Sequence, residues 1–87
     1  MVRCSDNSLY TGIAKDVARR FDEHQDNGPK CSKYLRGRGP LHLVFQQHIG
    51  SKSKALKIES RVKQLPKAKK EEILIDPTII QHLMEQL

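Results

Sequence analysis

The amino-acid sequence predicts a small α+β domain. Three observations support this fold class: two short, partly alternating apolar runs lie near the N-terminus, a third run follows near the middle, and segments with helical caps and spacing lie between and after them. A chain of 87 residues buries only about 60 to 65% of the surface that its unfolded form exposes. Its core must therefore be thin, and its 37% hydrophobic content suits a two-layer fold.

The first two runs, residues 2–4 and 8–13, are predicted to form a β-hairpin. Between them lie Ser5, Asp6 and Asn7, residue types whose side chains make local hydrogen bonds in turns. Asp16 can then cap a helix from Val17 to about Gln25. The sequence Asn-Gly-Pro at residues 27–29 is expected to end that helix.

Residues 41–45 read as a third strand, with Leu41, Leu43 and Phe45 on one face. A second helix is predicted to start at Ser51 or Ser53 and to run to Leu65. Pro66 either ends it or opens the next helix at its first position. Two further helical stretches are expected, at residues 67–75 and 78–87.

Several classes of protein are excluded by simple features of the chain. No apolar run approaches the ~20 residues that cross a bilayer, so no membrane insertion is expected, and the start MVRCSDNS has no signal-peptide pattern, which predicts a cytoplasmic protein. Cys4 and Cys31 lack zinc-site or C-x-x-C spacing and are expected to be reduced packing residues. With no internal repeat or linker, residues 1–87 are predicted to form a single domain.

Positive charge is concentrated in the middle of the chain, and the formal net charge is +6. From Asn27 to Lys70 there are 12 lysines or arginines and a single acid, Glu59. Such clustering is the electrostatic signature of a nucleic-acid partner, because neutralised phosphates release their counterions. A solvated lysine-rich surface is the other interpretation.

The segment NGPKCSKYLRGRGP, residues 27–40, is predicted to be a loop because glycine and proline interrupt it. A basic loop with one aromatic can follow a phosphate backbone and stack on a base. The alternative is a flexible solvated loop whose tyrosine folds back on the core. The candidate nucleic-acid-binding residues are Lys30, Lys33, Tyr34, Arg36 and Arg38.

Helical spacing separates the charged residues of the first helix. At ~100° per residue, Arg20 and His24 share a face with Val17 and Phe21. The opposite face carries Arg19, Asp22 and Glu23. A lone histidine on an apolar face is usually a core residue with satisfied hydrogen bonds, but the arginine one turn before it favours a functional site.

Glu59 lies at the margin of the apolar face of the second helix, which carries Ala55, Ile58, Val62 and Leu65, while Lys57 and Arg61 point away. It can form an internal salt bridge to an arginine, such as Arg20. It can also serve as an oxygen ligand for Mg²⁺, which takes few protein carboxylates and completes its shell with water and phosphate. Both interpretations remain open on the sequence alone.

The run Leu9–His24, LYTGIAKDVARRFDEH, resembles the second half of the motif of GIY-YIG nucleases. Tyr10-Thr11-Gly12 stands where that superfamily has Tyr-Ile-Gly, and Arg20 and His24 match its arginine and its later His or Tyr. Glu59 matches the glutamate of a later helix. The resemblance covers essentially the whole chain, and it is to the small stand-alone bacterial members.

This resemblance implies a three-stranded antiparallel sheet flanked by helices, and a monomeric endonuclease that hydrolyses DNA with one divalent ion, Mg²⁺ or Mn²⁺. Tyr10, helped or replaced by His24, would be the general base. Arg20 would stabilise charge on the phosphate, and Glu59 would hold the metal. Gly12 would leave room for the phosphate beside a tight turn.

The sequence departs from the family pattern in two places. The first tyrosine of the motif lies ten positions before Tyr10, one residue upstream of Met1, which predicts a first strand truncated at its N-terminus or a protein that has lost part of the site. The asparagine near the end of the family domain has no counterpart in the tail. A non-catalytic nucleic-acid-binding module is therefore the alternative to a nuclease, and a protein-interaction domain is a third class.

Overall fold

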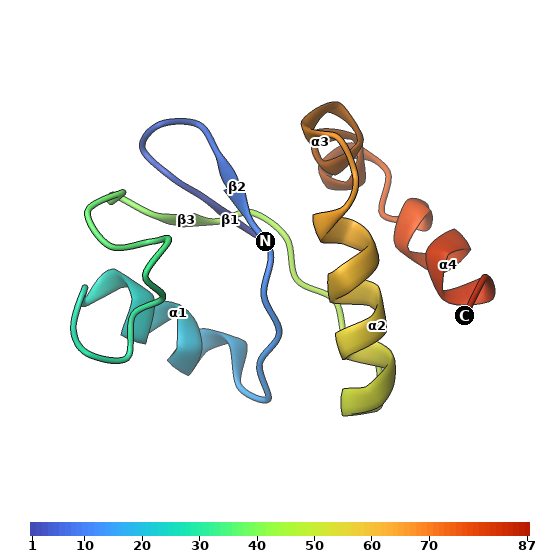
Figure 1. Cartoon of the computed structure of the whole chain (residues 1–87), viewed down its shortest axis with the longest axis horizontal. Coiled ribbons are helices and arrows are strands. Elements are labelled where there is room, and N and C mark those ends of the chain that lie inside the picture. Colours follow the sequence, from blue (N-terminus) through green and yellow to red (C-terminus); the bar gives the residue numbers. More distant parts are fainter. The chain divides into compact units, whose positions relative to one another are not determined.

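The computed structural model describes residues 1–87, which form two compact units, Met1–Gln46 and Gln47–Leu87. The first unit contains three strands and one helix, and the second contains three helices (Figure 1). No helix has the length and the apolar character that crossing a membrane requires. Each unit is described by itself.

The sheet of the first unit consists of β1 (Val2–Arg3), β2 (Leu9–Tyr10) and β3 (His42–Leu43), in the order β2-β1-β3. Both pairings are antiparallel, and Val2 faces Tyr10 on one side and Leu43 on the other. In the turn between β1 and β2, Cys4 N donates to Ser8 O at 3.0 Å. The predicted α+β class with a three-stranded antiparallel sheet is confirmed, although every strand is shorter than expected.

The predicted strand at residues 41–45 is wrong in its length and in its shared apolar face. Leu41 is 3% exposed, whereas Leu43 is 36% exposed. The regular ladder stops at Leu43 because its partner β1 is only two residues long. Beyond it, Val44 N and Phe45 N both donate to Met1 O, at 3.1 and 3.3 Å, so the alternation of faces ends there.

Helix α1 (Val17–Gln25) has the predicted bounds. Its N-cap is Asp16, whose carboxylate accepts a hydrogen bond from Arg19 N at 3.1 Å and so satisfies one of the free N–H groups of the first turn. Asn27 adopts a left-handed conformation, with φ 55°, just after the helix ends. Figure 1 shows α1 to one side of the three strands, followed by the long loop that returns to β3.

The core of the first unit is built largely from the sheet and from this loop. Its buried members are Val2, Cys4, Cys31, Leu35 and Leu41, with Tyr10 and Phe21 packed against them. Two of these side chains come from the loop, and both are 5% exposed or less. The cysteines are free and buried, which confirms that they are packing residues. Cys31 and Leu35 thus anchor the loop in the core, although most of its other residues are exposed.

Gln25 joins the end of α1 to the start of β3. Its amide nitrogen donates to Leu41 O at 3.0 Å, and its amide oxygen accepts from Leu41 N at 3.4 Å. This double hydrogen bond satisfies the backbone of a residue that lies just outside the ladder. It holds buried Leu41 beside the helix end.

The second unit contains α2 (Lys52–Lys63), α3 (Lys67–Ile75) and α4 (Thr78–Glu85), and α4 packs against both other helices. Ser51 caps α2 by accepting from Lys54 N at 3.2 Å. Pro66 precedes α3 as its N-cap. The predicted ends at Leu65 and Leu87 are wrong by two residues, because the final turns of α2 and α4 tighten into i→i−3 hydrogen bonds, such as Leu65 N to Val62 O.

Candidate active site

Tyr10, at the end of β2, lies between two other rings of the first unit. The His24 ring meets it edge-on, with centroids 5.8 Å apart and an interplanar angle of 72°. The Tyr34 ring stacks on it, with centroids 5.8 Å apart and an angle of 24°. The structure therefore brings together three predicted site residues from a strand, a helix and the basic loop.

Gly12 leaves room for the Tyr10 ring. A Cβ atom at position 12 would lie 3.1 Å from Tyr10 Cε1 and 3.7 Å from its hydroxyl oxygen. A contact of 3.1 Å is too close for a side-chain carbon unless the ring shifts. Close approach of the tyrosine is thus a reason for glycine at this position. Next to it, the buried hydroxyl oxygen of Thr11 has no hydrogen-bond partner.

His24 is the buried polar residue of α1, only 6% exposed, as its place on the apolar face predicts. Its Nδ1 accepts a hydrogen bond from Ser32 N at 3.3 Å. In the neutral ring, this bond assigns the proton to Nε2. His24 therefore presents an N–H donor, while its lone pair is already used by the loop.

Burial lowers the pKa of His24 below its ordinary value, and the nearby positive charge of Arg20 lowers that pKa further. The carboxylate of Glu23 acts in the opposite direction and raises it. Both causes of the decrease favour the uncharged imidazole, in agreement with the neutral tautomer that the Ser32 bond requires.

Arg20 is held by two acceptors at one of its nitrogens. Its Nη1 donates to Lys30 O at 2.6 Å and to Glu23 Oε1 at 3.3 Å. The N–H groups on Nε and Nη2 are not used in these two bonds. The side chain is 37% exposed, so it is both anchored and accessible.

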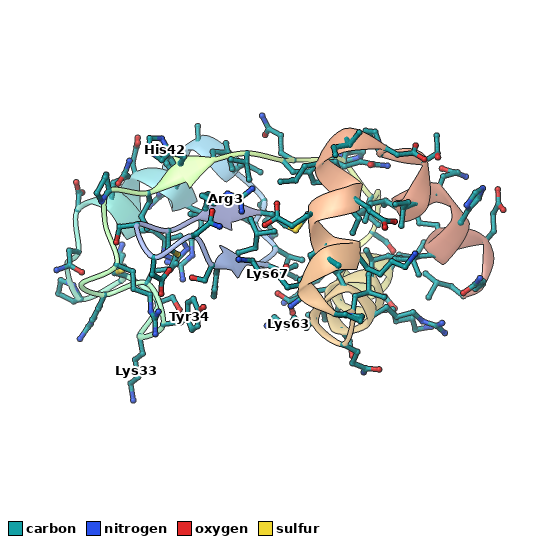
Figure 2. The ribbon with its side chains drawn as sticks, turned by 90° about the horizontal axis from the view of Figure 1, so that it is seen from above. Arg3, Lys33, Tyr34, His42, Lys63 and Lys67 are labelled. Atoms are coloured by element: carbon teal, nitrogen blue, oxygen red, sulfur yellow. The ribbon has the colours of Figure 1, made fainter.

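The four predicted cations of the loop differ in their surroundings. Arg38 forms an ion pair with Asp6, and Arg36 donates to the carbonyls of residues 28 and 29. Lys30 lies 3.7 Å from the Glu23 carboxylate but is 70% exposed. Lys33 extends away from the loop, beside Tyr34 (Figure 2). Of the four loop cations, Lys33 is thus the one whose charge is least neutralised by neighbouring groups of the protein.

Tyr34 combines features of both interpretations of the loop. Its ring stacks on Tyr10, and the Arg38 guanidinium lies over it at 4.2 Å from the centroid. It nevertheless remains 41% exposed. The side chain is folded back on the core, as one alternative proposed, and still has a free portion.

Glu59 lies on α2, in the second unit. Its side chain is 19% exposed, and its carboxylate lies 3.8 Å from Lys63 Nζ, one turn later. Ile58 and Val62, its neighbours on the buried face, are 5% and 2% exposed. The expected marginal position is confirmed. Within its own unit the carboxylate pairs with a lysine of the same helix, and within the other unit Arg20 pairs with Glu23.

Three residues of this region escaped the sequence analysis. Glu23 was assigned to the solvent face, but it is half-buried and binds both Arg20 and Lys30. Its spacing of three residues from Arg20 was the available signal. Ser32 contacts His24 through its backbone N–H, and Asp6 contacts Arg38, which lies 32 positions away. Neither contact produces a local pattern in the sequence.

An α+β domain with tyrosine, histidine and arginine converging beside a small antiparallel sheet is a candidate catalytic module. Residues 1–72 match the family model described as the GIY-YIG catalytic domain, and the chain belongs to this family. The match runs through residues of both units.

Two relatives illustrate the level of similarity. The chain is 54% identical over 74 residues to a UPF0213 protein of Cronobacter sakazakii, covering 85% of this chain and 76% of the relative. It is 45% identical over 87 residues to the UPF0213 protein YhbQ of Salmonella typhimurium, covering 100% of this chain and 85% of the relative. No solved structure matches the chain significantly.

The lowered pKa of His24 predicts that acid destabilises the protein. Between the folded pKa of His24 and its ordinary unfolded value of ~6.5, the unfolded chain binds more protons, so the stabilisation present above pH ~6.5 is lost as the pH falls. Urea unfolding at about pH 7.5 and about pH 5.5 measures this loss. The control is His24→Asn, whose side-chain oxygen can still accept from Ser32 N without titrating, and this variant should lose less stability. Equal losses in the two proteins would contradict the assignment of a neutral His24.

Proposed function

We propose that this protein is a divalent-metal-dependent DNA endonuclease. The observation that carries the proposal is the convergence of Tyr10 and His24, whose ring centroids lie 5.8 Å apart. Arg20 is close enough for its charge to lower the pKa of the imidazole. Membership of the GIY-YIG family supports the reaction class. The family match across both units supports the further proposal that residues 1–87 act as one domain, in the bacterial cytoplasm.

In this mechanism, Tyr10 acts as the general base in its phenolate form, which takes a proton from the attacking water and becomes the neutral phenol. The hydrogen bond from Ser32 occupies the lone pair of neutral His24, so this histidine is better suited to donate from Nε2 than to replace Tyr10 as base. A donor at that place can orient the Tyr10 oxygen, the water or a phosphate oxygen. Removal of the water proton and orientation of the nucleophile are thus divided between the two rings.

Arg20 supplies positive charge where negative charge develops on the phosphate. Its Nη1 is anchored by Lys30 O and Glu23, which leaves the other edge of the guanidinium free to contact phosphate oxygens. Because the arginine is already ordered, less side-chain entropy is lost when it binds the substrate.

The donor set of the chain fits one particular kind of metal site. No group of three or more His, Cys, Asp or Glu side chains in the structure could hold a metal ion alone. Mg²⁺ commonly binds through one or two carboxylates and completes its shell with water and substrate phosphate. Glu59, partly buried and paired only with flexible Lys63, fits that requirement. When bound there, Mg²⁺ or Mn²⁺ would supply Lewis-acid stabilisation of phosphate charge.

The basic loop is proposed to contribute phosphate contacts. Lys33, exposed and extended in Figure 2, is the strongest candidate, and Lys30 and Arg36 add positive charge around it. Arg38 is already paired with Asp6 and contributes less net charge. The loop is thus proposed to attract the backbone of DNA without reading its sequence.

Arg20 and Arg19 are adjacent arginines with opposite expected roles in cleavage. Arg20→Ala should reduce nicking of supercoiled plasmid about a hundredfold, as the loss of a transition-state charge stabiliser does, while Arg19→Ala should change it only a few fold. Arg20→Lys should restore activity in part, because one ammonium cannot reproduce the planar fork. DNA binding without nicking by the unaltered protein, in Mg²⁺ and in Mn²⁺, would identify the non-catalytic module instead.

Glu59 and Glu72 form a second matched pair, because each carboxylate contacts a lysine within its own helix, at 3.8 and 3.3 Å. Glu59→Gln should abolish nicking and weaken Mn²⁺ binding measured by calorimetry, whereas Glu72→Gln should leave both unchanged. Neither change should cost more than about 0.5 kcal/mol of stability, since each pair joins neighbours on one helix and both lysines are exposed. Normal Mn²⁺ binding by Glu59→Gln would remove Glu59 from the metal site.

Lys33 is predicted to contact phosphate. Lys33→Ala should weaken DNA binding at low salt and lower the slope of log affinity against log salt by about 1. Lys69→Ala is the control, because Lys69 is paired with Glu72 in the other unit. A slope that stays the same in Lys33→Ala would exclude this part of the loop from the interface.

A further inference from the structure

Resting on the proposed nuclease function, we propose that Tyr34 is a positioning residue, which fixes the orientation of the Tyr10 ring for catalysis. It acts through the stacked contact with Tyr10, and not through a base of the nucleic acid. This gives the basic loop a second role, as part of the support of the general base.

Tyr10 needs such support because its own strand is short. β2 contains only two residues and lies at the edge of the sheet, where its sole neighbour is β1. A tyrosine ring there can rotate about its side-chain bonds unless neighbours restrict it. His24 contacts one part of the ring edge-on, and Gly12 allows the backbone to approach it closely. Tyr34 supplies the parallel stacking surface.

Tyr34 is itself held firmly. Its neighbour Leu35 is 1% exposed and belongs to the core, so the backbone at this point cannot move freely. The Arg38 guanidinium lies 4.2 Å from the ring centroid, within range of a cation–π interaction. Arg38 in turn forms an ion pair with Asp6. The backbone carbonyl of Arg38 also accepts a hydrogen bond from Ser5 N at 2.8 Å. The ring is thus tied to the turn between β1 and β2.

This arrangement weighs against a base-stacking role for Tyr34. A base that stacked on its ring would compete with Tyr10 and with Arg38, both already in contact with it. The offset stacking of two aromatic rings is favourable beyond the area it buries, so a base that displaced Tyr10 from the Tyr34 ring would lose that contact. Tyr34 keeps this stacked contact although 41% of the residue remains exposed.

The composition of the chain provides a direct measurement. It contains two tyrosines and no tryptophan, so in any Tyr34 variant the near-ultraviolet circular dichroism of the phenol band arises from Tyr10 alone. Tyr34→Phe keeps the stacking ring, and Tyr34→Leu removes it. We expect Tyr34→Phe to retain a strong Tyr10 signal and Tyr34→Leu to lose most of it, with far-ultraviolet spectra unchanged because Tyr34 lies at the surface.

The second measurement is cleavage by saturating protein, together with DNA affinity. Tyr34→Leu should slow cleavage about tenfold, as expected for a misplaced catalytic group that has lost an aromatic contact, and Tyr34→Phe should restore it. Affinity should change little in both variants. A weakened affinity with an unchanged saturated rate would overturn the proposal in favour of base stacking.

The two proposals fail in distinguishable ways. If the unaltered protein cleaves no DNA, the proposed nuclease function fails, and the circular dichroism alone decides whether Tyr34 orients Tyr10. If the Tyr10 signal is the same in Tyr34→Phe and Tyr34→Leu, Tyr34 does not position that ring, whatever the activity.

Discussion

The burial of two loop side chains, Cys31 and Leu35, is the constraint on which the first unit depends. Three strands of two residues each cannot enclose a core, and a sheet of that size is marginal without packing against other elements. The loop supplies the missing apolar surface, with both side chains 5% exposed or less. The segment that carries half of the lysines and arginines of the first unit is therefore also a structural layer.

That dual role explains how the site is held. With Cys31 buried, the next residue is placed so that Ser32 N donates to His24 Nδ1, which keeps a buried imidazole satisfied and neutral. With Leu35 buried, Tyr34 is placed against Tyr10. A histidine that a sequence pattern assigns either to a core or to a site can belong to both, because the same hydrogen bond that makes its burial tolerable also fixes which nitrogen donates.

The sequence predicts well the features that depend on local signals. The bounds of α1 follow from Asp16 and from the Asn-Gly-Pro that ends it, and the burial of His24 follows from helical spacing. Local signals do not predict the length of β3 or the ion pairs that the loop cations form. They depend on a partner strand of only two residues and on contacts such as that of Arg38 with Asp6, 32 positions apart, for which periodicity and propensity give no signal.

The ion pairs of the first unit reduce the positive potential that its lysines and arginines would otherwise produce. Glu23, the acid nearest the site, contacts Arg20 and Lys30, and so removes part of the positive potential that a count of residues implies. At the same time it holds Arg20 Nη1 in place, and the proposed contact with two phosphate oxygens would use the other edge of the guanidinium. Glu23 thus orients Arg20 but weakens the long-range attraction of this region for phosphate. For the catalytic role proposed for Arg20 this exchange is favourable, because an ordered donor stabilises a transition state more than a diffuse field does.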